Sequence, residues 1–319
     1  MANGDRARPG RIGVLDIGSN TVLLLVLAAD GRIVRDEARI TRLGQGVFAS
    51  GELAGEAVAR TRTAIADFAR LARAEPVERL VAVGTEALRR ARGGAEFLAG
   101  LVRDGLVDGA RLLSGAEEAD LTLEATRRSV GAGRAALAVI DVGGGSTEVA
   151  WRESLAGPVG GVSLPLGSVR LTEAHLPRHP IPAADLAALR ELARAAAGPL
   201  RSALPHGLPR DAAVVAVAGT ATTLAALELR LAVYDRERVE GLELERAVLE
   251  RWIATLAPLG VAERRRLPGL EPERADVIVA GLVCLELALD CLRAERFRVS
   301  ERGVRHGVAL RMLAGQPLI

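Results

Sequence analysis

The chain has 319 residues, in which 42 basic and 40 acidic side chains leave a net charge of +2, and aromatic residues make up only 2%. The near balance gives no sign of a nucleic-acid or membrane partner, and so few aromatic side chains leave little material for base stacking. All 42 basic residues are arginine. A Walker-type phosphate loop, a Schiff-base lysine and a kinase-type strand lysine are therefore excluded, so phosphate recognition must use arginine and backbone amides.

Apolar runs with strand and helix periodicity alternate along the first half of the chain. This alternation predicts an α/β protein with mixed sheets covered by helices on both faces. The predicted elements are strands at 12–16, 22–29 and up to 40, a helix over 52–74, a strand at 80–83, a helix from 86, a strand at 111–113 and a helix from 115.

The second half continues in the same way, with prolines bracketing the loops around one long helix. Its predicted elements are a strand near 159–164, a helix over 183–204, a strand running through 219–220 into a helix, and helices around 244–256, 274–292 and 302–313. The apolar helix at 277–292 could be a dimer face or could be buried within its own subunit. Its two cysteines, Cys284 and Cys291, are expected to be buried thiols.

A repeated segment divides the chain into two similar halves. GVLDIGSNTVLLL at 13–25 is echoed by AVIDVGGGSTEVA at 138–150. Each copy is a buried strand, an aspartate at its end, a glycine-rich turn and a second strand. We expect two domains, 1–124 and 125–300, with the helix at 301–319 returning to the first.

The repeated turns are suited to holding phosphate. Glycines let backbone N–H groups come close to an anion, and an aspartate at the strand end, Asp16 or Asp141, can hold hydrated Mg²⁺ against it. A single copy could equally be a plain hairpin turn. Two copies in register suggest that two phosphate-binding turns, one from each half of the chain, close on one phosphate chain.

Six segments in chain order resemble the exopolyphosphatase and guanosine pentaphosphate phosphohydrolase family. They are LDIGSNTVLLLV, VAVGTEALRRA, LLSGAEEADL, VIDVGGGSTEVAW, VAVAGTATTLAAL and SERGVRHG. The resemblance implies two ribonuclease H-like domains of the sugar kinase, Hsp70 and actin superfamily, with the active site in the interdomain cleft. It also implies hydrolysis of the terminal phosphoanhydride bond of inorganic polyphosphate, assisted by Mg²⁺ or Mn²⁺.

The two glutamates after Ser114 can be separated physically. Ser114 and Glu117 have the spacing of a capping box, which makes Glu117 structural. Glu118 points about 100° around the helix from Glu117 and is expected to stay free to accept a proton from the attacking water. It also matches the catalytic glutamate of the family, so Glu118 is the predicted general base, with a plain surface glutamate as the alternative.

Other site residues follow from the resemblance and from the turns. Arg89 matches the phosphate-contacting arginine of the family and could reach a phosphate in a forked way, although Glu86 stands where many relatives have a small residue. Arg90 and Arg92 are expected to be solvated, as is the run 264–266, which could alternatively guide a polyanion. The predicted phosphate-binding residues are Gly18, Ser19, Asn20, Arg89, Gly143, Gly144, Gly145, Ser146 and Thr147, and the predicted metal ligands are Asp16, Asp141 and Glu148.

Several alternatives stay open at this point. Guanosine pentaphosphate (pppGpp), cut at its 5′ terminal phosphate, presents the same bond as polyphosphate. A kinase or nucleotide switch with the same fold, or an alarmone-binding regulator, would share the paired glycine-rich turns. Relatives with C-terminal extensions suggest that this chain prefers short polyphosphate, or forms a homodimer that completes the channel. Without a secretory signal or a membrane-spanning apolar run, a cytoplasmic protein is expected.

Overall fold

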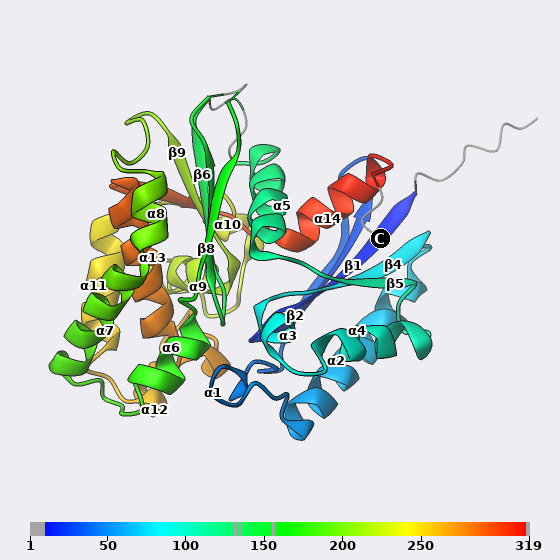
Figure 1. The fold of residues 1–319 in the computed structure, drawn as a ribbon, viewed down its shortest axis with the longest axis horizontal. Helices are drawn as coiled ribbons and strands as arrows, with labels where there is room; N and C mark the ends of the chain where they lie inside the picture. Colours follow the sequence, from blue (N-terminus) through cyan, green and yellow to red (C-terminus); the bar gives the residue numbers. More distant parts are fainter. Residues whose placement is uncertain (1–9, 131–132, 134, 155–156, 317–319) are drawn as a thin grey trace, which may run out of the picture.

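The protein folds into two lobes, each built on one β-sheet, as the computed structural model shows (Figure 1). The structure describes residues 10–130, 133, 135–154 and 157–316. The ends of the predicted domains, 1–9 and 317–319, lie outside these residues. The domain boundary at 124/125 stays a prediction.

The first sheet has five strands in the described part of the chain, in the order β3-β2-β1-β4-β5. β1 pairs antiparallel with β2 and parallel with β4, so the sheet is mixed, as predicted. The strands are β1 (Arg11–Ile17), β2 (Thr21–Ala28), β3 (Ile33–Ile40), β4 (Arg79–Gly84) and β5 (Gly109–Leu112). The helices of this part of the chain are α1 (Val47–Ser50), α2 (Gly55–Ala74), α3 (Glu86–Arg90) and α4 (Gly94–Arg103).

The second sheet, counted over the same described residues, has six strands in the order β10-β11-β9-β6-β7-β8. Its strands are β6 (Leu137–Val142), β7 (Thr147–Arg152), β8 (Gly160–Leu164), β9 (Ala213–Val217), β10 (Glu243–Glu245) and β11 (Arg296–Val299). Its helical segments are α6 (Ser168–His175), α7 (Ala183–Ala196), α8 (Gly198–Ala203), α9 (Ala218–Glu228), α10 (Arg236–Val239), α11 (Arg246–Leu256), α12 (Val261–Arg264), the 3₁₀ turn η1 (Pro272–Arg274) and α13 (Ile278–Leu292).

The sequence repeat corresponds to the same hairpin in both sheets. β6 pairs antiparallel with β7 and parallel with β9, as β1 does with β2 and β4. In both hairpins the glycine N–H after the first strand donates to a carbonyl three residues on, from Gly18 to Thr21 and from Gly143 to Ser146, each at 3.0 Å. The two halves therefore place equivalent turns at the ends of equivalent strands.

Two helices lie between the lobes, α5 (Gly115–Arg127) and α14 (Val304–Leu313) (Figure 1). α5 contacts β6, β7 and β8, whereas α14 packs on β1 and β2 and against α5. The contact between the helices is close, because a Cβ on Gly307 would lie 2.2 Å from the carbonyl oxygen of Leu121. The chain thus returns from the second sheet to complete the apolar face of the first.

Some local predictions are wrong. The helix expected over 183–204 is broken between α7 and α8, where Gly198 and Pro199 follow Ala197. The strand expected through 219–220 ends at Val217, and Ala218 begins α9 with a φ of 64°.

Arg264 is also misplaced by the sequence analysis. Its side chain is fully buried and not solvated, and it donates to the carbonyls of Leu256 at 2.8 Å and Ala275 at 3.0 Å. It therefore ties the end of α12 to the end of α11 and to the residues before α13.

The apolar helix α13 lies inside the second lobe. Its residues belong to the large core cluster of that lobe, together with both cysteines, which are buried free thiols as expected. Burial raises the pKa of Cys284 to about 12. Among the described residues, none of the helices combines the length and the apolar character needed to cross a membrane.

Candidate active site

A cavity of about 590 Å³ lies between the two lobes. The ends of β1 and β4 and the turn after β1 line it from the first lobe. The turn between β6 and β7 and the N-terminus of α9 line it from the second. The predicted site residues on this surface are Asp16, Ser19, Asn20, Glu118, Asp141, Gly143, Gly144, Gly145, Ser146 and Glu148.

The two glycine-rich turns meet across the cavity. A Cβ on Gly144 would lie 3.0 Å from the Cβ of Ser19, and one on Gly145 would lie 2.9 Å from its hydroxyl oxygen. The side-chain amide of Asn20 is buried and makes no hydrogen bond within the described residues. A buried amide without a partner is costly, so this group is suited to binding a ligand.

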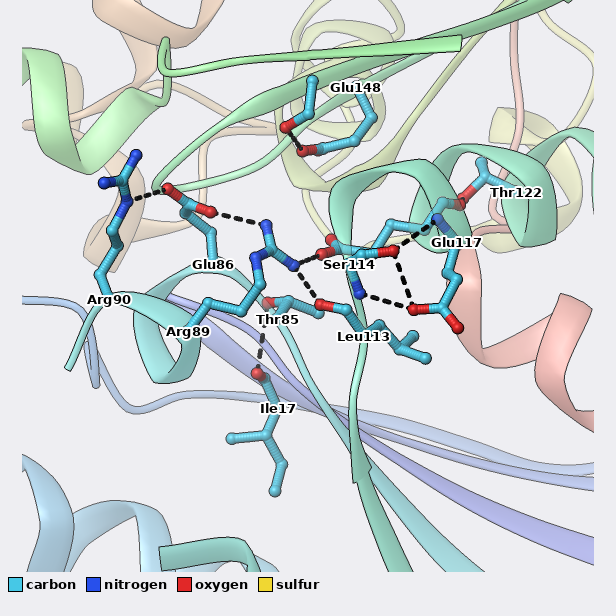
Figure 2. Close-up of polar contacts among 12 residues, drawn as sticks. Ile17, Thr85, Glu86, Arg89, Arg90, Leu113, Ser114, Glu117, Thr122 and Glu148 are labelled. Atoms are coloured by element: carbon cyan, nitrogen blue, oxygen red, sulfur yellow. Dashed lines mark hydrogen bonds and ion pairs between the residues drawn. The ribbon is translucent and has the colours of Figure 1, made fainter. Parts of the chain in front are cut away.

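The carboxylate of Glu118 is at the start of α5, buried and lining the cavity. Ser114 and Glu117 form the predicted capping box, in which the Ser114 N–H donates to the Glu117 carboxylate at 2.8 Å (Figure 2). The expectation that Glu118 stays free is wrong, because its carboxylate is ion-paired with Arg89. The same guanidinium donates to the carbonyl of Leu113 at 2.5 Å, so Arg89 ties α3 to the start of α5.

Burial also shapes the ionisation of Glu118. It raises the pKa of this group well above its usual range, and the nearby Glu148 raises it further, whereas Arg89 lowers it. A carboxyl group in this state is a stronger base than an exposed glutamate. Glu118 therefore holds a proton more tightly than an exposed glutamate does.

Three more acids lie buried nearby, and burial is the main cause that raises the pKa of each. The pKa of Asp16 is about 6 and that of Glu148 about 6. The pKa of Asp141 is about 8, because repulsion from Glu148 and Asp16 adds to the effect of burial. The cation of Arg305 acts in the opposite direction on Asp16 and Asp141.

This acidic donor set fits a hard divalent cation. Asp141 and Glu148 are direct cross-strand neighbours on β6 and β7, and both line the cavity. In the described part of the chain, no three side chains of ligand type converge into a ready-made metal cage. Mg²⁺ does not need one, since it commonly binds through one or two carboxylates, water and substrate phosphate oxygens.

The wall of the cavity also includes apolar and aromatic residues of both lobes. They are Leu23 and Ala38 of the first sheet and Ala226, Leu231 and Tyr234 of the second lobe. These residues were not predicted as part of the site, because they come from segments far apart in the sequence.

Two polar groups at the cavity were also missed. The side chain of Asp36 of β3 is buried, and its carboxylate accepts from Arg305 Nε at 3.1 Å and from Arg236 Nη1 at 2.8 Å. Glu86 is buried at the start of α3, where it binds two arginines (Figure 2). For Glu86 the only signal in the sequence was its bulk at a position that is small in many relatives.

The fold and the site together define a two-lobed phosphate-handling enzyme with an acidic centre between repeated glycine turns. A model of the Ppx/GppA phosphatase family matches residues 26–316. The chain belongs to the Ppx/GppA phosphatase family, as predicted, and is a hydrolase of that family.

Individual relatives match over nearly their whole length. Exopolyphosphatase 2 of Mycobacterium tuberculosis is 34% identical over 322 residues, which cover 96% of this chain and 99% of that relative. Exopolyphosphatase 1 of Mycobacterium bovis is 32% identical over 308 residues, covering 95% and 88%.

Solved structures of the family have the same architecture. The Aquifex aeolicus Ppx/GppA member has a TM-score of 0.78 at 30% identity, covering 96% of this chain and 98% of that one. An exopolyphosphatase-like protein has a TM-score of 0.88 at 28% identity, covering 96% and 99%. The predicted fold class, two mixed sheets with flanking helices in the actin-like ATPase arrangement, is confirmed.

Proposed function

We propose that the protein is an exopolyphosphatase that hydrolyses the terminal phosphoanhydride bond of inorganic polyphosphate. The observation that carries this proposal is the burial of Glu118 in the wall of the cavity that both glycine-rich turns also line, where it is ion-paired with Arg89 and close to other acids. Relatives named exopolyphosphatase that align over nearly the whole chain support the choice of substrate.

In this proposal Glu118 accepts the proton of the attacking water, and burial, which raises its pKa, makes it a stronger base than an exposed glutamate. Arg89 holds the carboxylate in place and contacts the phosphate. Three of the predicted donors are used within the fold, since the N–H groups of Gly18 and Gly143 donate to the carbonyls of Thr21 and Ser146 at 3.0 Å and the Thr147 hydroxyl donates to the carbonyl of Leu166 at 2.5 Å. The terminal phosphates therefore receive hydrogen bonds from Ser19, Asn20, Gly144, Gly145 and Ser146, which line the cavity. These donors stabilise the charge spread over the phosphoryl oxygens, which is the main requirement of phosphoryl transfer.

Asp141 and Glu148, with Asp16 from the other lobe, are the residues that would hold Mg²⁺ or Mn²⁺. When bound, the ion supplies charge neutralisation for the phosphate oxygens. Without a cation, a polyanion would have to approach several buried acids, which is unfavourable. Homodimerisation, a preference for short chains and a cytoplasmic location are further parts of this proposal that rest on the resemblance.

Replacing the proposed base tests the mechanism. In Glu118→Gln we expect kcat to fall by about 10²- to 10⁴-fold, since general base catalysis contributes this much, while the Kd for polyphosphate stays within a few-fold. Glu117→Gln is the matched control, because glutamine also fits a capping box, and should keep near-normal turnover. Undiminished phosphate release by Glu118→Gln would reject the assignment.

A second substrate, pppGpp, is favoured by one observation. The cavity of about 590 Å³ has apolar residues and Tyr234 in its wall, besides the acids and the phosphate turns, and a nucleoside could contact these side chains. Phosphate release from tripolyphosphate, long-chain polyphosphate and pppGpp should be compared side by side under one set of conditions. We expect the highest kcat/KM with polyphosphate, and a clear preference for pppGpp would replace the first proposal with the second.

A further inference from the structure

Glu86 is a residue of the cavity wall and lies at the centre of a group of arginines, which are not themselves among the described residues that line the cavity. Its carboxylate accepts from Arg89 Nη2 at 2.6 Å and from Arg90 Nε at 2.8 Å (Figure 2). A third guanidinium, that of Arg170 on α6, lies 3.9 Å away through Nη1. Glu86 is 7% exposed and lines the cavity. One carboxylate is therefore shared by three cations that come from both lobes.

Arg170 is held in place without a strong partner of its own. Its guanidinium lies over the ring of Phe48, 5.3 Å from the centroid. Its Nη1 atom is buried and makes no hydrogen bond within the described residues. Burial lowers the pKa of Arg170, and repulsion from Arg90 adds to this. A further anion would therefore stabilise the Arg170 guanidinium in this position.

The charges at this point favour a phosphate over a carboxylate. Three guanidinium groups face Glu86, and among the described residues only Arg89 has a second carboxylate partner, Glu118. A phosphate group offers more oxygens and more negative charge than a carboxylate, and it matches the forked donors of arginine. In the described residues the buried Nη1 of Arg170 has no hydrogen-bond acceptor, so a phosphate oxygen at this point would supply one.

We propose that Arg89, Arg90 and Arg170 form an anion subsite for a phosphate group, and that Glu86 fills this subsite until the phosphate displaces it. The phosphate belongs either to the bound polyphosphate or to the released orthophosphate. This inference rests on the proposed function only for the first of these sources. Glu86 is thus a residue that sets affinity and specificity, and it competes with the ligand from within the chain.

Direct binding of orthophosphate, measured by calorimetry, tests the subsite without any turnover. In Glu86→Gln we expect the Kd to fall about three- to tenfold, because one competing charge is lost while the amide oxygen still accepts from arginine. In Arg170→Gln we expect the Kd to rise about tenfold, since one charge-assisted contact is lost. Arg92→Gln is the matched control, because Arg92 is 74% exposed and pairs with Glu52, and its Kd should not change.

The same Kd in Glu86→Gln and the parent, or a weaker one, would overturn the proposal. If Glu86→Gln does not fold, Arg170→Gln still decides, because an unchanged Kd there rejects the subsite. Thermal unfolding of each variant shows whether it is folded. A chain that hydrolyses no polyphosphate would refute the proposed function, yet these binding data would still test the subsite.

Kinetics then separate the two sources of phosphate. If the subsite holds a phosphate of the substrate, Glu86→Gln lowers the KM for tripolyphosphate or for longer chains. If it holds the product, Glu86→Gln leaves KM unchanged and strengthens inhibition by added orthophosphate. If neither KM nor product inhibition changes, the cluster is an ion pair of the fold and the proposal fails.

Discussion

At the scale of single residues, opposing influences set the state of the proposed base. Burial and Glu148 keep the proton on Glu118, and Arg89 favours its loss. The sequence could identify Ser114, Glu117 and Glu118, because a capping box is a local pattern of four residues. It could not show that Arg89 would bind Glu118, or that Arg264 would be buried, since these contacts depend on segments joined only by the fold.

Arg89→Gln should therefore change the pH dependence as well as the rate. With the cation gone, the pKa of Glu118 rises, so the acidic limb of the kcat/KM profile moves to higher pH. We also expect kcat/KM to fall at least about tenfold, because a charge-assisted phosphate contact is lost. The measurement is a pH–rate profile beside that of Arg92→Gln, which should match the parent. A lower rate with an unmoved acidic limb would show that Arg89 does not act on Glu118.

At the scale of elements, the hairpins were predictable and the helix contacts were not. The two strand–turn–strand units follow from local alternation and glycine placement, and both appear as predicted. The break between α7 and α8 was missed because the alanine- and leucine-rich composition of 183–204 hides Gly198 and Pro199. The packing of α14 on α5 could not be predicted from the sequence either. The two helices are separated along the chain by all the strands of the second sheet.

Gly307→Ala tests how closely these two helices must approach. The new Cβ would lie 2.2 Å from the carbonyl oxygen of Leu121, so the helices would have to move apart. We expect a loss of about 2 kcal/mol in the free energy of unfolding, as for other overpacked sites, measured by chemical denaturation. Gly198→Ala, where the added Cβ meets nothing within 4 Å, should stay within about 0.5 kcal/mol of the parent. Equal stabilities of the two variants would contradict the close contact.

At the scale of the whole molecule, ion pairs hold the lobes together beside the cavity. Arg42 donates to both carboxylate oxygens of Asp276 at 2.8 Å, and Asp36 joins Arg236 of the second lobe to Arg305 of α14. These partners are 200 or more residues apart. Sequence patterns act over much shorter distances, so no motif indicated these contacts.

Asp36→Asn should weaken this arrangement strongly. The side chain of Asp36 is 2% exposed, and its loss of charge leaves the buried cation of Arg305 without its main partner. Breaking a buried pair in this way costs about 3–5 kcal/mol, so we expect a clear fall in the free energy of unfolding. Replacement of the exposed Asp211 by asparagine is the control and should have little effect. A variant as stable as the parent would show that the pair contributes nothing net.

The buried acids predict that metal-free protein loses stability as pH rises. The pKa values of Asp16 at about 6, Glu148 at about 6 and Asp141 at about 8 lie above those of the unfolded chain. The folded state therefore holds extra protons between about pH 4 and 8, and the stabilisation is lost as pH passes through these values. In chelator, we expect Tm to fall between pH 5 and 8.5.

Magnesium should reverse this loss, and more strongly at pH 8.5 than at pH 5, because the acids that would hold it are then ionised. Asp141→Asn removes the group with the highest of these pKa values. Without metal at pH 8.5, its Tm should exceed that of the parent by at least about 2 °C. A Tm that changes with neither pH nor magnesium would argue against an acidic metal site.

The position of α14 has a consequence for how the protein is made. The face of β1 and β2 that α14 covers includes Val14, Leu25 and Leu27, which are buried in the finished molecule. The residues of α14, 304–313, leave the ribosome after every strand of both sheets, so a nascent chain presents this apolar surface uncovered through most of its synthesis. We expect translation arrested before residue 304 to yield chains that recruit chaperones or aggregate. We expect phosphatase activity only in chains that include α14.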